Sequence, residues 1–174
     1  MLASVAQRVI VIAFLGLLFF WSTTVSAGQF APETKVVAQL YKNHGWMALT
    51  AQHALFGEGL RSESKLDLEK YFAPDLAGLF VADAACVVRE RGICHLDFDP
   101  LFASQDPCVT DLEVRYLSSG KVSVQFKDPV TNETTQILFE LGIIRGEWKI
   151  TDILYRRPAP FFLKEMLSRP APKG

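Results

Sequence analysis

The stretch that decides the fold is "LEVRYLSSGKVSVQFKDPVTNETTQILFELGIIRGEWKITDILY", residues 112–155. Apolar and polar residues alternate in four runs within it, which predicts β-strands that each turn one face toward a core. The runs are separated by "SSG", by "DPVTNET" and by a tight turn around Arg145 and Gly146, all rich in turn-forming residues. Because these connections are short, we expect the four strands to pair antiparallel in sequence order.

The sequence before this stretch has the spacing of helices. Pro32 begins an amphipathic segment that ends at Gly45, and a second helical piece is expected over 47–56. A longer helix is predicted from Pro74 to Gly92, which suits the left-handed terminal position, and we expect this helix to cover the sheet. Helices followed by a meander predict an α+β domain, with helices packed on one face of a curved four-stranded sheet.

The C-terminal tail predicts one more short helix, over residues 161–168, between two Pro-Ala-Pro segments. Its apolar side chains either dock on the domain or face a partner, and docking is the expectation.

The N-terminus has the pattern of a secretory signal. Residues 9–21 are an apolar run of thirteen, too short to span a bilayer comfortably, and small residues precede Gly28. We therefore expect a signal peptide over 1–27 and a single domain over 28–174, with its core at about 32–157. The alternative is an uncleaved N-terminal anchor. After cleavage no stable membrane span is expected.

The three cysteines agree with export, because an oxidising compartment would pair two of them. Cys94 with Cys108 is the expected disulfide, since both residues lie in irregular chain at the ends of one loop. Cys86 with Cys94 is the alternative, because a turn at Gly92 can bring Cys94 back toward the helix. Pairing would also consume the thiols that, with His95, could otherwise hold zinc, so no metal or cofactor is expected.

The loop "CHLDFDPLFASQDPC", residues 94–108, contains two aspartates that directly precede proline. Asp99 and Asp106 are expected to accept hydrogen bonds from their own backbone in turns. Phe98 with Leu101 or Phe102 is expected to fill the base of the core.

Three segments in order resemble a known family: "LDFDPLFASQD", the alternating strands, and "GEWKITDILY". The chain resembles a bacterial secreted domain of unknown function with the nuclear transport factor 2-like fold, over about residues 32–167. The resemblance implies a cone of bent sheet wrapped by helices. Proteins of this wider fold include isomerases, dehydratases, delivery factors and immunity proteins that neutralise toxins, so the resemblance implies no single activity and no catalytic residues.

The inward face of the last strand is the first place to look for chemistry. If the strand is regular, Asp152 lies among Trp148, Ile150 and Leu154, where desolvation would raise its pKa and suit it to act as a general base. The alternative is that a bulge turns Asp152 outward, or that it accepts backbone hydrogen bonds. The expected ligand-binding residues are Trp148, Asp152, Tyr155, Tyr116 and Phe126.

The sequence therefore predicts a periplasmic or secreted, non-enzymatic binding domain for an unknown protein or a small apolar ligand. An immunity-type role against a toxin is suggested by fold analogy alone, and a homodimer is left open. The alternative is a small pocket enzyme of the isomerase or hydratase type that uses Asp152 as general base. A net charge of −1 without a basic stripe argues against nucleic acid as a partner.

Overall fold

The computed structural model describes residues 30–49, 59–156 and 159–170. The expected signal peptide, and most of the helical piece expected over 47–56, lie outside these residues. Within the described part of the chain, no helix is both long enough and apolar enough to cross a membrane.

Helices fill the first half of the described chain. Proline begins both long helices, as the sequence predicts, and an acid lies in the first turn of each. The second long helix ends one residue early, because Arg91 rather than Gly92 takes the left-handed conformation, at φ 52°. The helical elements are α1 (Pro32–His44), η1 (Gly45–Ala48), η2 (Leu60–Ser62), α3 (Lys65–Leu68) and α4 (Pro74–Glu90).

The sheet of the described residues has five antiparallel strands in sequence order, so the prediction of four strands is wrong by one. The four predicted strands are present, and the fifth is a two-residue strand in the tail. Its residue Phe162 pairs with Leu154, because the chain returns along the edge of the fourth strand before it enters a helix. The elements are β1 (Thr110–Ser118), β2 (Lys121–Lys127), β3 (Thr134–Ile144), β4 (Glu147–Tyr155), β5 (Phe161–Phe162) and α5 (Leu163–Leu167).

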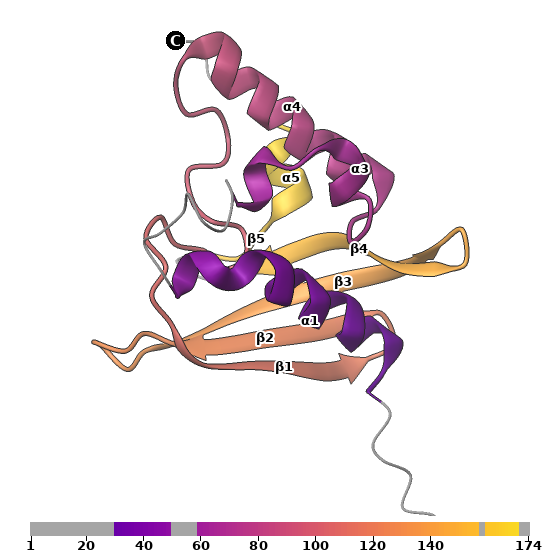
Figure 1. The fold of residues 1–174 in the computed structure, drawn as a ribbon, viewed down its shortest axis with the longest axis vertical. Helices are drawn as coiled ribbons and strands as arrows, with labels where there is room; N and C mark the ends of the chain where they lie inside the picture. The colour runs from indigo at the N-terminus through magenta and orange to yellow at the C-terminus, as the bar shows by residue number, and fades with distance from the viewer. Residues whose placement is uncertain (1–29, 50–58, 157–158, 171–174) are drawn as a thin grey trace, which may run out of the picture.

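The helices are distributed differently from the expectation that the long helix covers the sheet. Figure 1 shows α1 lying across the sheet, while α3, α4 and α5 gather beyond the β4 edge. Helix α1 contacts β1, β2 and β4, and its Val37 and Leu40 are completely buried. The short C-terminal helix docks on the domain, since Leu163 and Leu167 are buried.

The loop before β1 closes the base of the core, as expected. Asp99 Oδ1 accepts a hydrogen bond from Leu101 N at 2.7 Å, and Leu101 is completely buried. Two buried tyrosines hold the same loop: Tyr41 Oη donates to Leu101 O at 2.5 Å, and Tyr155 Oη donates to Pro100 O at 2.8 Å. Burial raises the pKa of the Asp99 carboxyl and of both phenols.

The disulfide joins Cys86 to Cys94, with Cα atoms 6.1 Å apart, so the expected pairing of Cys94 with Cys108 is wrong. Cys108 is a free, exposed thiol. The physical reason is the left-handed Arg91, which turns the chain back along the last turns of α4. There Asp83 also accepts a hydrogen bond from His95 N at 2.9 Å. Among the described residues, no group of three potential ligands is arranged to hold a metal ion.

Candidate functional site

A bulge in β4 decides where Asp152 points. Glu140 pairs with Asp152 and Leu141 with Ile150, so Thr151 is an extra residue in β4. The strand is therefore not regular: Ile150 and Ile153 are both buried, whereas Asp152 is only half-buried. The alternative prediction, a bulge that turns Asp152 out of the core, is confirmed.

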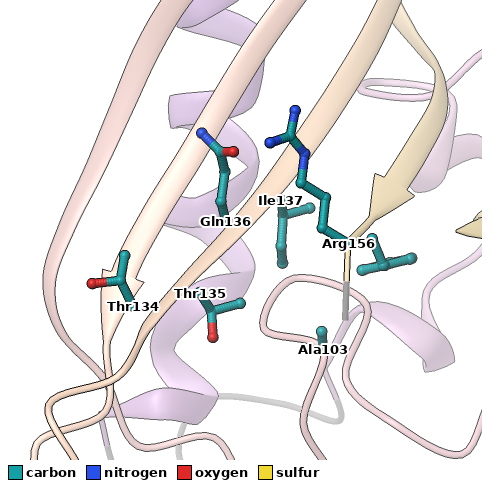
Figure 2. A pocket seen from close by; sticks show the side chains of 7 residues that line it. Ala103, Thr134, Thr135, Gln136, Ile137 and Arg156 are labelled. Carbon is teal, nitrogen blue, oxygen red and sulfur yellow. The ribbon is translucent and has the colours of Figure 1, made fainter. Parts of the chain in front are cut away.

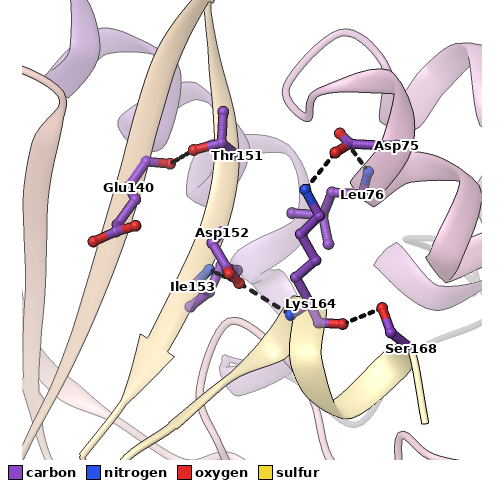
Figure 3. A network of polar contacts seen from close by, with 8 residues as sticks. All are labelled: Asp75, Leu76, Glu140, Thr151, Asp152, Ile153, Lys164 and Ser168. Carbon is purple, nitrogen blue, oxygen red and sulfur yellow. Dashed lines mark hydrogen bonds and ion pairs between the residues drawn. The ribbon is translucent and has the colours of Figure 1, made fainter.

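Asp152 fastens helix α5 to the edge of the sheet. Its Oδ1 accepts hydrogen bonds from Ile153 N at 2.8 Å and from Lys164 N at 3.0 Å (Figure 3). Lys164 is the second residue of α5, whose first N–H groups have no partners within the helix. The side chain of Lys164 also reaches Asp75 on α4. Asp152 thus makes the contacts of a helix-capping residue supplied by a neighbouring strand.

The other residues predicted to bind a ligand do not share one cavity with Asp152. Phe126 and Tyr155 are buried in the core, and each contributes to the wall of a different surface hollow. Tyr116 lies on β1 and is 48% exposed. Trp148 is half-buried beside Gly120, at the other end of the sheet from Tyr155.

A hollow of about 270 Å³ lies where β3 begins and β4 ends. Figure 2 shows the amide of Gln136 and the guanidinium of Arg156 extending side by side in the same direction. The hollow borders the core, because Ile137 and Tyr155 are almost completely buried there. The lining residues are Ala103, Thr134, Thr135, Gln136, Ile137, Tyr155 and Arg156.

The hollow forms because β3 is longer than its neighbour at this end. The last pair of the two strands is Ile137 with Tyr155. Continued pairing would place Pro158 opposite Thr134, and proline has no N–H to donate to a ladder. The side of Thr134 that faces β4 is therefore left without a strand partner among the described residues.

Arg156 gives the hollow its charge. Its side chain is exposed, and no carboxylate of the described residues pairs with it. The remaining polar groups of the lining, Thr134, Thr135 and Gln136, are neutral hydrogen-bonding groups. A guanidinium beside neutral donors can bind a carboxylate, and the described residues of the lining include no acid or histidine to move a proton.

Sequence reasoning missed this hollow, because Arg156 stands directly after the last predicted strand and two residues before a proline. The available signal in the sequence was Pro158, because a proline cannot donate to a strand ladder.

Comparisons with models of protein families, with curated proteins and with solved structures find no match to this chain. The resemblance to the secreted family with the nuclear transport factor 2-like fold, and the cone that it implies, therefore stay predictions.

Proposed function

We propose that this chain is an exported, non-enzymatic binding domain, and that its ligand presents a carboxylate to the hollow at the ends of β3 and β4. The observation that carries the proposal is Arg156, a cation without a carboxylate partner among the described residues, in the lining of a hollow with neutral hydrogen-bonding groups. A guanidinium is suited to a carboxylate because its N–H groups can form two parallel hydrogen bonds to the two oxygens.

The rest of the lining supports the same ligand chemistry. The Gln136 amide and the hydroxyls of Thr134 and Thr135 can donate to the same anion. A volume of about 270 Å³ suits a short organic acid or the last residue of a peptide.

Export is supported by two separate features. The disulfide between Cys86 and Cys94 is of the kind that persists in oxidising compartments. Residues 1–27 have the composition of a signal peptide. In the periplasm the carboxylate can come from a small metabolite or from the C-terminus of a protein, and an immunity-type role would use the second source.

The enzyme alternative receives less support from the geometry. Asp152, the expected general base, uses Oδ1 to accept two backbone hydrogen bonds, and it does not line the hollow. A binding role needs only the cation and the donors that the hollow contains.

The experiment is a titration followed by calorimetry or by NMR shifts, with two sets of probes. The first set is short carboxylic acids and their amides, and the second is short peptides with free or amidated C-termini. We expect the charged form of each pair to bind and its amide to bind at least about tenfold more weakly. Binding by acids and peptides alike indicates a small-molecule site, and binding by peptides alone indicates a protein partner.

The matched variants are Arg156→Gln and Arg145→Gln. Both remove an exposed arginine, but Arg145 lies in the β3–β4 turn, away from the hollow. We expect only Arg156→Gln to weaken carboxylate binding, by tenfold or more. Equal binding of acids and amides, equal effects of the two variants, or no binding of any probe would overturn the proposal.

A further inference from the structure

Strand β1 is an open edge of the sheet. It pairs with β2 on one side, and on its other side the described residues supply no strand (Figure 1). All of its residues are exposed except Val114, which is half-buried. Leu112 is 41% exposed and Tyr116 is 48% exposed, so the edge carries apolar surface as well as free backbone groups.

The direction of these backbone groups follows from the register. On β3, Leu141 N donates to Gly120 O, on the side of β2. The N–H and C=O groups of successive residues in a strand point alternately to one neighbouring strand and to the other. This alternation can be followed through the β2–β3 register and then through the β1–β2 register. It shows that the backbone groups of Glu113 and Arg115 bond to β2. The N–H and C=O groups of Val114 and Tyr116 therefore point away from the sheet.

Bulges limit how much of the edge can pair. The register with β2 shifts between Thr110 and Glu113 and again between Tyr116 and Ser118. Between these shifts the strand pairs with β2 in one register, from Glu113 to Tyr116. Bulges of this kind restrict edge-to-edge association to a short, defined segment.

The sequence of this segment, "LEVRY" from Leu112 to Tyr116, is complementary to itself when it is read in the opposite direction. We propose that β1 pairs antiparallel with β1 of a second copy of this chain, on a twofold axis through Val114. Glu113 then lies opposite Arg115 of the second copy, twice, with the two Val114 residues between these pairs. This inference goes beyond the proposed function, because it involves the sheet edge and not the hollow.

Hydrogen-bond directions and charges agree on this register. Val114 would exchange two backbone hydrogen bonds with its symmetry mate, since its N–H and C=O groups point outward. Glu113 and Arg115 would form the non-hydrogen-bonded pairs, in which opposite side chains are closest, at about 4.5 Å between Cα atoms. In the single chain these two side chains already form an ion pair on the exposed face, at 2.5 Å.

The charges on this edge differ from those on sheet edges that avoid association. Edges that avoid association carry like charges, often lysines, which repel an approaching copy. Here the two charges have opposite signs and stand symmetrically about Val114. A twofold pairing is isologous, so each favourable contact occurs twice.

The test is sedimentation equilibrium over a range of concentrations, on protein expressed from its full sequence. We expect a monomer–dimer equilibrium for the natural chain. Glu113→Arg and Arg115→Glu each place like charges opposite one another, so each variant alone should dimerise at least about tenfold more weakly. Both residues are exposed, so at concentrations where the natural chain is monomeric the far-UV circular dichroism and the thermal midpoint should stay close to those of the natural chain.

The register itself is tested by restoring the complementarity. A mixture of the two single variants should form a heterodimer, because two arginines then face two glutamates. The double variant Glu113→Arg with Arg115→Glu should regain the natural dimer. Arg145→Glu, the same reversal on an exposed residue of the β3–β4 turn, should leave dimerisation unchanged. A monomeric natural chain, single variants that dimerise like it, or failure of both restorations would overturn the proposal.

Discussion

One edge of the sheet is covered by other parts of the chain, and the other edge is open. At the β4 edge the chain covers its own strand with β5, with the segment around Phe72 and with helix α5. At the β1 edge the described chain adds no further strand, and every residue of β1 except Val114 is exposed. The difference shows where this protein obtains its stability and where it is available to other molecules.

The covered edge is closed by backbone contacts as well as by packing. Ala73 N donates to Ile150 O at 2.8 Å, and Ile150 N donates to Tyr71 O at 2.8 Å. These bonds satisfy polar groups of β4 that the neighbouring strands do not reach, and they bring Phe72 fully into the core. Substitutions at this edge should therefore affect folding, whereas substitutions at the β1 edge should affect association.

The largest expected decrease in the free energy of unfolding is that of Phe72→Ala. Phe72 is completely buried in the segment that closes the β4 edge, so its truncation should lower the free energy of unfolding by about 3 to 5 kcal/mol. Urea unfolding followed by circular dichroism measures this change. The matched substitution at the open edge, Leu112→Ala, should change the free energy by less than about 1 kcal/mol. Equal losses for the two variants would contradict the contrast between the edges.

The second largest decrease in the free energy of unfolding is expected when the disulfide is lost. This disulfide anchors the end of α4 beyond the covered edge. Replacing Cys86 and Cys94 by serine should cost about 2 to 3 kcal/mol, the value expected for a closed loop with a sequence separation of 8. Urea unfolding measures it, and Cys108→Ser is the control, expected within about 0.5 kcal/mol of the natural chain. If Cys108→Ser were the costly change, the pairing would be Cys94 with Cys108.

A smaller effect is expected for Asp152→Ala, which removes the acceptor that fastens α5 to β4. Two backbone N–H groups lose their partner, so the free energy of unfolding should fall by about 1 to 2 kcal/mol. Hydrogen exchange at Lys164 N should accelerate. Asp152→Asn keeps an oxygen acceptor and should recover most of the loss; an equal loss in both variants would show that the charge matters more than the hydrogen bonds.

The smallest effect concerns Asp75, which pairs with Lys164 across the covered edge. The hydrogen bond from Lys164 lowers the pKa of the Asp75 carboxyl. Its contribution is therefore complete above the unfolded pKa of about 4, and it is lost as the pH falls through the lower folded value. Asp75→Asn should cost about 0.2 to 1 kcal/mol at pH 7, because both groups are well exposed.

Unfolding at pH 7 and at pH 2 to 3 separates this ion pair from other effects of the substitution. The difference between Asp75→Asn and the natural chain should shrink at the lower pH. A difference that is the same at both values would mean that the pair contributes nothing through its charge.

Local sequence was informative where local chemistry governs the backbone. Alternation predicted the four long strands, Pro32 and Pro74 predicted the starts of the long helices, and Asp99 predicted the turn at the base of the core. The β3–β4 turn contains Arg145 and Gly146, both at positive φ as such a tight turn requires. Each of these features depends on residues that are near one another in the chain.

The candidate site could not be predicted in the same way. The hollow depends on how far β3 extends beyond β4, and Arg156 becomes significant only beside Gln136. The position of Asp152 depends on one extra residue in β4, and a one-residue shift moves a side chain to the other face of a sheet. Periodicity gives no sign of such a bulge.

By itself the sequence determined the α+β class, the order of the elements and the turns between the strands, because propensity and periodicity act over a few residues. The tertiary structure alone decided which cysteines pair, which edge of the sheet is covered and which way Asp152 points. These outcomes depend on where segments far apart in the chain meet, and the left-handed Arg91 and the bulge at Thr151 set those meetings.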